Sequence, residues 1–441
     1  MCAGPGGATA LSLLAFAALA AGPALAGETT TTLEVPAATS VFSEPVTVTA
    51  ILTATGAAPS GALRIQDGGK TIATETLVGG PLVYAALHAG RAFACALLDD
   101  DTVQCWGRNS SGQLGDGTND GRLTPGAVTG LSGPVTDLAL GSGSSHACAL
   151  IDDGTVQCWG NNFRGQLGDG TTEERPIPVS VTGLGGTAIA IDAGDRHSCA
   201  ILQGGSVQCW GENNKGQLGD GGTTDSAAPV TVAGLSGPAT ALAPGQEHTC
   251  ALIQGGTVQC WGNGSSGRLG NGGTADSLTP VSVSSLSGAV TAIASGSFHT
   301  CALIDGGAMQ CWGRGTFGQI GNGSTNFNNT TPKTVSGIST ATAIATGTVH
   351  SCAVLDGGTA KCWGENSVGA LGDGTKVQRN SPVSVQGLAG TVTAMAGGAG
   401  ATYALLGDGL LQAWGLNAEG EFGDGTTTST TAPVDVLDPT V

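Results

Sequence analysis

The stretch HACALIDDGTVQCWGNNFRGQLGDG, residues 146–170, carries the pattern that decides the fold. Two apolar runs flank a turn at Asp153, and glycine-rich turns follow. Similar stretches recur along the chain, each with one tryptophan, and neighbouring tryptophans are 53 residues apart once and 51 residues apart five times. The tryptophans are Trp106, Trp159, Trp210, Trp261, Trp312, Trp363 and Trp414. Repetition at a fixed period of this length indicates a repeat architecture, with copies over about residues 81–437.

Each repeat contains four short segments with strand character. In the second copy these are residues 135–140, 146–151, 155–159 and 178–181, and Pro178 at the start of the last one suits an outer edge strand. The 77 glycines and the low share of charged residues, 11%, fit many short strands and tight turns. We therefore predict an all-β chain in which residues 81–437 form a seven-bladed β-propeller with four-stranded blades, closed by packing without a strand shared between its ends.

The recurring blocks GxxHxCAL, TVxCWGxN, GQLGDGT and PVxV resemble the repeats of the regulator of chromosome condensation family. The resemblance implies a seven-bladed propeller. It leaves the activity open, because nucleotide-exchange factors, chromatin binders and secreted bacterial proteins use this repeat, and a fold does not determine a function. The chain differs from the eukaryotic exchange factor in its acidity, its export signal and its lack of a basic tail, which argues against a GTPase or nucleosome partner.

Six of the seven copies carry two cysteines with nine residues between them, whereas the seventh has Tyr403 and Ala413 at these positions. Both cysteines are therefore lost together, as a covalent pair requires. If the hairpin turns at Asp153, Cys148 and Cys158 face each other within disulfide reach. We predict six disulfides, which join Cys95 to Cys105, Cys148 to Cys158, Cys199 to Cys209, Cys250 to Cys260, Cys301 to Cys311, and Cys352 to Cys362.

Two metal sites are alternatives to this interpretation. A zinc site could use the histidine before each cysteine pair, but the first copy keeps both cysteines with Phe93 in place of the histidine. We expect buried hydrogen-bonding histidines at His146, His197, His248, His299 and His350. A calcium site could use the acidic turn residues, but asparagine replaces aspartate in two copies, so we assign Asp116, Asp169, Asp220, Asn271, Asn322, Asp373 and Asp424 to tight turns. No metal and no cofactor are predicted.

The third residue after each tryptophan is asparagine in five copies and glycine in two. The series is Asn109, Asn162, Asn213, Gly264, Gly315, Asn366 and Asn417. Both residue types tolerate a left-handed backbone, so the exchange predicts a positive φ at this position.

The chain before the repeats has two parts. Residues 1–26 contain an apolar stretch and end in the small-x-small sequence Ala24-Leu25-Ala26, which predicts a signal peptide for export. Residues 27–79 contain TTTTLEV, SEPVTVTAILT and SGALRIQDGGKTIATETL, which resemble bacterial immunoglobulin-like repeats, and we expect a partial module of that kind that serves as a spacer or stalk. Residues 438–441 form a short C-terminal tail.

The composition and the motifs restrict the function. A net charge of −18 disfavours nucleic acid as a partner, and no apolar stretch after the signal is long enough for a membrane span. No nucleophile elbow, phosphate loop or zinc-protease motif occurs, and we predict no enzyme and no catalytic residue. The variable loops contain the candidate binding residues Phe163, Arg164, Glu173, Glu174, Arg175, Phe317, Lys376 and Arg379.

The sequence thus predicts a monomeric binding scaffold, secreted or at the cell surface, that recognises an extracellular protein or glycan through its propeller loops. A secreted enzyme inhibitor is the alternative, since β-lactamase-inhibiting propellers share this repeat and an export signal. A polysaccharide-active enzyme is a third hypothesis, because propeller enzymes place their chemistry in loops that depart from the repeat.

Overall fold

The computed structural model describes residues 82–437 and the backbone of residues 31–33, 50–52, 61–67 and 70–77. The chain divides into two units, residues 1–82 and residues 83–441. In the first unit, β1 (Thr31–Leu33) pairs with β2 (Ala50–Leu52), and β3 (Gly61–Asp67) forms a hairpin with β4 (Lys70–Leu77). The expected signal peptide and C-terminal tail lie outside the described residues, as does most of segment 27–79, so its immunoglobulin-like nature stays a prediction.

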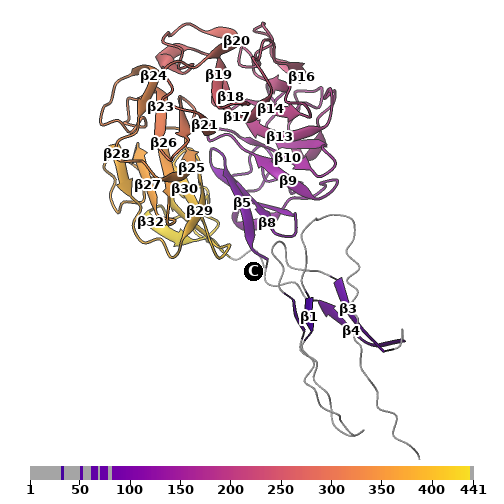
Figure 1. Ribbon diagram of the computed structural model, residues 1–441. Coiled ribbons are helices and arrows are strands. Elements are labelled where there is room, and N and C mark those ends of the chain that lie inside the picture. Colours follow the sequence, from indigo (N-terminus) through magenta and orange to yellow (C-terminus); the bar gives the residue numbers. More distant parts are fainter. Residues whose placement is uncertain (1–30, 34–49, 53–60, 68–69, 78–81, 438–441) are drawn as a thin grey trace, which may run out of the picture. The chain divides into compact units, whose positions relative to one another are not determined.

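Seven four-stranded antiparallel sheets form the second unit and lie as blades around a ring (Figure 1). Within each sheet the strands pair in chain order, so every blade is a simple meander. The predicted all-β seven-bladed propeller is confirmed.

The strands of the first four blades follow in chain order. Blade 1 contains β5 (Tyr84–Ala89), β6 (Phe93–Leu98), β7 (Val103–Gly107) and β8 (Arg122–Ala127). Blade 2 contains β9 (Val135–Ala139), β10 (His146–Ile151), β11 (Val156–Gly160) and β12 (Arg175–Ser180). Blade 3 contains β13 (Ala188–Ala193), β14 (His197–Leu202), β15 (Val207–Gly211) and β16 (Ser226–Thr231). Blade 4 contains β17 (Ala239–Pro244), β18 (His248–Ile253), β19 (Thr257–Gly262), the short helix η1 (Ser265–Gly267) and β20 (Ser277–Ser282).

The last three blades repeat the arrangement. Blade 5 contains β21 (Val290–Ser295), β22 (His299–Ile304), β23 (Met309–Arg314) and β24 (Asn328–Thr334). Blade 6 contains β25 (Ala341–Thr346), β26 (His350–Leu355), β27 (Ala360–Gly364) and β28 (Arg379–Ser384). Blade 7 contains β29 (Val392–Gly397), β30 (Ala401–Leu406), β31 (Leu411–Gly415) and β32 (Thr430–Asp435).

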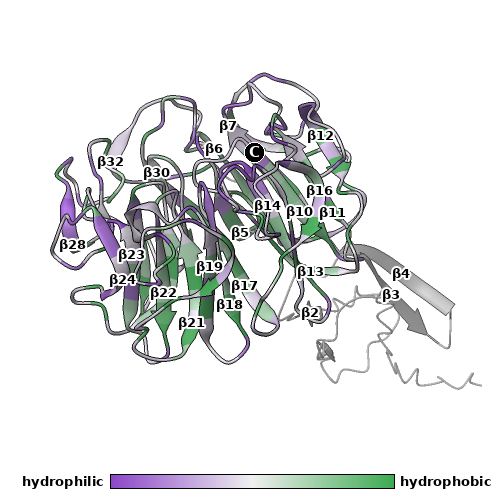
Figure 2. Cartoon of the chain, turned by 90° about the horizontal axis from the view of Figure 1, so that it is seen from above, coloured by the Kyte–Doolittle hydropathy of each residue, from purple (hydrophilic) through white to green (hydrophobic). Residues whose placement is uncertain are grey.

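The outermost strands begin earlier than the sequence predicts. In blade 2 the strand starts at Arg175, which pairs with Gly160, and Pro178 lies inside it. A bulge between Cys158 and Gly160 allows this longer pairing. Figure 2 shows hydrophobic residues on inner strands such as β18 and β22 and hydrophilic ones on the outermost strand β28.

The hydrophobic core lies between neighbouring blades. One cluster combines Leu150 and Val156 of blade 2 with Ile191 and Trp210 of blade 3. Each tryptophan is buried and donates its indole N–H to a backbone carbonyl of the preceding blade. In blades 2 to 7 the bonds run from Trp159 to Gln113, Trp210 to Gln166, Trp261 to Gln217, Trp312 to Arg268, Trp363 to Gln319 and Trp414 to Ala370, over 2.9 to 3.0 Å. The repeat position that the sequence marks most clearly therefore joins the blades.

The five in-register histidines also join neighbouring blades, as buried hydrogen-bonding residues. Each Nε2 lies 2.8 to 2.9 Å from a hydroxyl of the next blade, in the pairs His146 with Ser198, His197 with Thr249, His248 with Thr300, His299 with Ser351, and His350 with Thr402. Burial lowers the pKa of His146 to about 3, so its imidazole is neutral. Blade 1 has Phe93 and blade 7 has Ala401 at this position, so the interfaces of blade 1 with blades 7 and 2 lack the bond.

The ring closes without a shared strand, since β5–β8 and β29–β32 are separate sheets of consecutive strands. Packing is supported by hydrogen bonds between the first and last blades. Trp106 Nε1 donates to the Glu421 carbonyl at 2.7 Å, and the Tyr84 hydroxyl donates to the Leu437 carbonyl at 2.8 Å. The backbone N–H of Gly425 donates to Leu123 at 2.9 Å. Closure thus uses the same tryptophan bond as the other interfaces.

The cysteines pair as predicted. Cys148 and Cys158 are direct partners across β10 and β11, and the six disulfides have Cα separations of 4.0 to 4.1 Å. In blade 7 the buried ring of Tyr403 stands at the first cysteine position, and its hydroxyl donates to the Glu421 carbonyl.

The positive φ expected at the asparagine/glycine position is wrong. None of these seven residues has a positive φ. Asn162 is instead a hydrogen-bond centre, whose Oδ1 accepts from the Leu167 N–H at 2.9 Å and whose Nδ2 donates to the Thr171 carbonyl at 3.1 Å. In the copy with Gly264, a Cβ would lie 1.9 Å from the Ala275 carbonyl oxygen, so backbone occupies the place of the asparagine side chain. Glycine is needed there for space.

Candidate binding face at the channel mouth

Two faces of the ring differ in the loops that form them. One, here called the mouth face, contains the loops from first to second and from third to fourth strands of each blade. The opposite turn face contains the short turns between second and third strands, such as that between β10 and β11. A cavity of about 680 Å³ lies on the mouth face, lined by residues of blades 1 to 7 that include Arg91, Phe163, Arg196, Phe298 and Ala399.

A longer loop in blade 2 crosses the channel mouth. Residues 141–145 belong to the one loop between first and second strands that has two extra residues, which explains the single tryptophan spacing of 53. The Ser142 carbonyl accepts from the Thr348 hydroxyl of blade 6 at 3.3 Å, and the Ser144 carbonyl accepts from the Arg91 N–H of blade 1 at 2.9 Å. The loop therefore forms a plug, residues 141–145, that narrows the channel on this face.

Asp195 of blade 3 anchors the plug. Its carboxylate accepts the Gly143 N–H at 3.1 Å and the Ser297 hydroxyl of blade 5 at 3.1 Å. Burial raises the pKa of Asp195 to about 6, although these hydrogen bonds and the charges of Arg196 and Arg91 act in the opposite direction. One side chain thus joins three blades around the opening.

Phe163 and Arg164, both predicted binding residues, line this cavity. The Phe163 side chain is exposed, at 69%, although phenylalanine is usually buried. Arg164 reaches Asp225 at 3.2 Å and Glu212 at 3.5 Å, and Arg196 reaches the same buried Glu212 carboxylate at 3.6 Å. Two arginines are therefore held beside an exposed ring by one buried carboxylate.

Phe317, also predicted, belongs to an aromatic group around Arg314. The Arg314 guanidinium carbon lies 5.3 Å from the centre of the Phe298 ring, 5.7 Å from Phe317 and 5.5 Å from Phe327, and Phe327 is 54% exposed. Arg268 stacks on Phe298 at 5.0 Å. These cation–π contacts hold the rings together at the surface. Because Phe298 also lines the cavity, the group continues the surface that Phe163 begins.

The other predicted residues lie in the loops between third and fourth strands or, for Arg175 and Arg379, at the first residue of the fourth strand. Arg175 bonds to Asp169 at 2.9 Å and Arg379 bonds to Asp373 at 2.8 Å, so both guanidinium groups hold the aspartate of their own turn. Glu173 pairs with Arg175 at 3.3 Å. Two further residues complete the set, Glu174, which accepts from Asn161 Nδ2 at 2.9 Å, and Lys376, which is exposed.

The described residues contain no group of three His, Cys, Asp or Glu side chains that could hold a metal. One arrangement resembles an activated nucleophile, because His146 Nε2 lies 2.8 Å from Ser198 Oγ. Ser198 is 1% exposed, and its hydroxyl donates to the Gln166 carbonyl at 3.0 Å, so no substrate reaches it. The described part of the chain has no helix of the length and apolar character that a membrane crossing requires.

Sequence reasoning missed Arg91, Asp195, Arg196, Phe298 and Arg314. Two of them, Arg196 and Phe298, immediately precede the repeated histidine inside the most regular block of the repeat. Comparison of equivalent positions could have found them, since that position reads Ala92, Ser145, Arg196, Glu247, Phe298, Val349 and Gly400. A variable position inside an otherwise constant block is the signal that was available.

Comparisons with known proteins identify the repeat and agree with the propeller fold. The family model of the regulator of chromosome condensation (RCC1) repeat matches residues 100–150, 153–201, 204–252, 255–303, 307–354 and 359–405. The chain is 32% identical to the ultraviolet-B receptor UVR8 of Arabidopsis thaliana over 72% of this chain and 73% of UVR8. It is 31% identical to the human E3 ubiquitin-protein ligase HERC2 over 69% of this chain but only 6% of HERC2.

Among solved structures, Prp20p of Saccharomyces cerevisiae, described with its binding properties to Gsp1p and histones, superposes with a TM-score of 0.68 at 24% identity, over 81% of this chain and 88% of Prp20p. The likeness confirms the fold. With six matched repeats and a relative above 30% identity over most of both chains, the chain belongs to the regulator of chromosome condensation repeat family.

Proposed function

We propose that this protein is a non-catalytic binding scaffold, secreted or at the cell surface, that holds a protein partner on its mouth face. The exposed Phe163 beside Arg164 at the rim of the cavity carries the proposal, because aromatic residues and arginine dominate the energetic centres of protein interfaces. The Phe298, Phe317 and Arg314 group extends this surface. Arg175 and Arg379 are engaged by their own turns, so we place them outside the central contact.

Six disulfides support an oxidising location, since such bonds persist outside the cytosol. The buried histidines and the bonded cysteines offer no accessible nucleophile or base, which supports a role without turnover. A protein partner is favoured over a glycan because the surface combines several aromatic rings with arginines held in place by carboxylates.

The test compares three immobilised forms of the full chain, namely the wild type, Phe163→Ala/Arg164→Ala, and Leu410→Ala. Leu410 is 46% exposed and lies on the turn face, so its variant controls for loss of a surface hydrophobic residue. Proteins captured from culture fluid and cell envelope are identified by mass spectrometry, purified and titrated.

We expect the captured protein to bind wild type and Leu410→Ala alike. Binding to the double variant should be weaker by roughly 30-fold or more, which corresponds to about 2 kcal/mol. Equal binding of the captured protein to all three forms, or the capture of no protein by the wild type, would overturn the proposal.

A further inference from the structure

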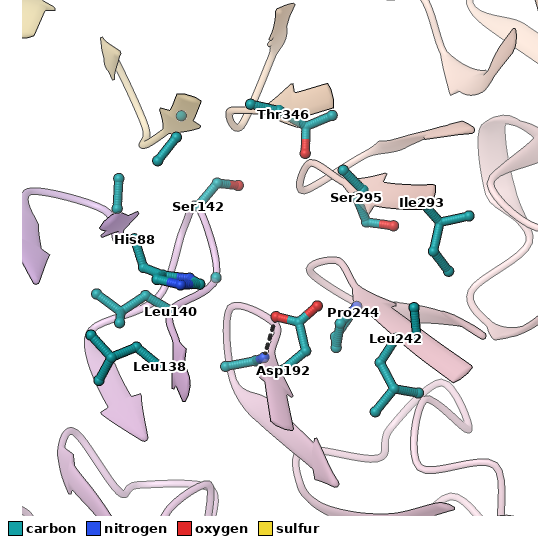
Figure 3. Close-up of a pocket in the computed structure, with 18 of the residues that line it drawn as sticks. His88, Leu138, Leu140, Ser142, Asp192, Leu242, Pro244, Ile293, Ser295 and Thr346 are labelled. Atoms are coloured by element: carbon teal, nitrogen blue, oxygen red, sulfur yellow. Dashed lines mark hydrogen bonds between the residues drawn. The ribbon is translucent and has the colours of Figure 1, made fainter. Parts of the chain in front are cut away.

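The central channel contains a second cavity, of about 370 Å³, which shares no lining residue with the cavity on the mouth face (Figure 3). The innermost strands of all seven blades line it. Much of the wall is apolar, through side chains such as Leu87, Leu138, Leu242, Ile293 and Met395. A linear ligand with an apolar body would fit such a wall.

Strand register shows that two equivalent positions of each innermost strand carry alanine, with three exceptions among the seven blades. The channel position paired with the first cysteine, or with Tyr403 in blade 7, reads His88, Ala139, Asp192, Ala243, Ala294, Ala345 and Ala396. The position two residues earlier reads Ala86, Asp137, Ala190, Ala241, Ala292, Ala343 and Ala394. All three exceptions, His88, Asp137 and Asp192, are titratable, and they lie on consecutive blades 1, 2 and 3. The titratable groups of the cavity therefore lie on one side only, and the polar side chains on the other blades, such as Ser295 and Thr346, are uncharged hydroxyls.

None of the three side chains has a counter-charge among the described residues. Asp192 accepts only the N–H of its neighbour Ala193, at 2.8 Å, and the Asp137 carboxylate accepts the backbone N–H of Leu138 at 2.9 Å and that of Ile191 in blade 3. No hydrogen bond to the His88 side chain is present in residues 82–437, and its imidazole points into the channel, as does the Asp192 carboxylate (Figure 3). Carboxylates without a counter-charge in a half-buried site reduce stability.

The pKa values of the three side chains are shifted in the direction that burial without a counter-charge produces. Burial, with a contribution from Asp137, raises the pKa of Asp192 well above its usual range, and burial raises the pKa of Asp137 to about 6. Burial lowers the pKa of His88 to about 4, so the imidazole is a neutral hydrogen-bonding group at neutral pH. The side of the channel formed by blades 1 to 3 thus lacks a positive charge.

We propose that the channel binds a short aliphatic diamine, with one ammonium group at Asp137 and the other at Asp192. The two carboxylates lie on neighbouring blades and differ by two residues along the strand direction, a rise of about 6.6 Å, so the ligand must place its two ammonium groups at different depths of the channel, as a short methylene chain allows. The chain would contact the apolar wall, and the neutral His88 would accept a hydrogen bond from the ammonium at its level. An organic cation fits better than a metal ion, because the described residues contain no three-ligand group.

The test is calorimetric titration of the full, unreduced chain with putrescine, with butylamine as the matched monoamine. The variants are Asp137→Ala and Asp192→Ala, which introduce the alanine that the other six blades carry at the first position and five of them carry at the second. Asp305→Ala is the control, because this exposed turn aspartate removes the same charge outside the channel. Circular dichroism checks that all variants fold.

We expect saturable binding of one putrescine, at least ten times tighter than butylamine. Each channel variant should lose at least tenfold in affinity, whereas Asp305→Ala should match the wild type. Binding near neutral pH should release protons, since the ammonium favours ionised Asp192. Without ligand, Asp192→Ala should unfold at a higher temperature than the wild type, because it removes an unpaired carboxylate.

Three results would overturn the proposal. They are the absence of binding, equal binding to all four forms as expected for adsorption to a chain of net charge −18, and binding of butylamine as tight as that of putrescine. The Phe163→Ala/Arg164→Ala variant should bind putrescine with the affinity of the wild type. The diamine proposal and the proposal for the mouth face are therefore tested independently.

Discussion

The interface between blades 7 and 1 should be weaker than the five interfaces that carry a histidine bond, and Trp106→Phe should expose this difference. Five interfaces combine a tryptophan bond with a histidine bond, whereas this one has the Trp106 bond to Glu421 and no histidine. Trp261→Phe is the matched control. It removes an equivalent 2.9 Å bond to Gln217, but the His197–Thr249 pair remains at that interface.

The local cost should be the same at both sites. Loss of one buried hydrogen bond contributes about 1 kcal/mol, and the smaller ring leaves a void worth about 1 to 2 kcal/mol. Each acceptor keeps a second donor, which is the Tyr403 hydroxyl at Glu421 and the Thr249 hydroxyl at Gln217. Both substitutions should therefore destabilise by about 2 to 3 kcal/mol, and only the consequence for the ring should differ.

Hydrogen exchange measured by mass spectrometry distinguishes the two variants. In Trp106→Phe the amides of β5 and β29 should exchange about 30 to 150 times faster than in the wild type, because the interface opens before the molecule unfolds. In Trp261→Phe the amides of β17 should stay close to the global rate. The same local acceleration in both variants would refute the reasoning, since all interfaces would then be equivalent.

Three further predictions concern one disulfide, the asparagine position and Asp195. Replacement of Cys250 and Cys260 by alanine should lower the free energy of unfolding by about 2 to 3 kcal/mol, measured by urea denaturation, because the unfolded chain gains loop entropy. Asn162→Gly should destabilise by about 2 to 4 kcal/mol in the same assay, because it removes the bonds to Leu167 and Thr171, whereas a positive φ would make glycine neutral or better. Because the pKa of Asp195 is raised to about 6 in the folded state, the folded chain holds the proton more tightly than the unfolded chain does. The free energy of unfolding should therefore fall from about pH 4 to pH 6 and level off above, and Asp195→Asn should flatten this dependence.

The architecture could be predicted from the sequence because its determinants recur in register. Three features of the sequence report on contacts within one repeat or with its neighbour. They are the tryptophan spacing, the paired cysteines, and the replacement of both cysteines by Tyr403 and Ala413 in the seventh copy. Any such contact is sampled seven times, so a single exception is informative. The cysteine pairing was predictable because Cys148 and Cys158 are in one hairpin.

The prediction of a positive φ at the asparagine/glycine position was wrong for a physical reason. Asparagine and glycine share a tolerance for positive φ, but they also exchange wherever backbone can replace an amide side chain. At Gly315 a Cβ would lie 2.5 Å from the Asn326 carbonyl, and this approach depends on the path of a loop eleven residues away. A residue pattern does not contain that path, so the choice between the two explanations required the structure.

The candidate binding residues show how a repeat protein should be compared with itself. Arg175 and Arg379 look individual in the loops, yet they occupy one register position with Arg122, and each pairs with the aspartate of its own turn. His88 and Asp192 look unremarkable in the sequence, yet they stand where five blades carry alanine. Alanine packs at this position in five blades, and the titratable exceptions have a cost in stability. The residues that depart from the repeat pattern are therefore the positions where a function independent of folding is expected.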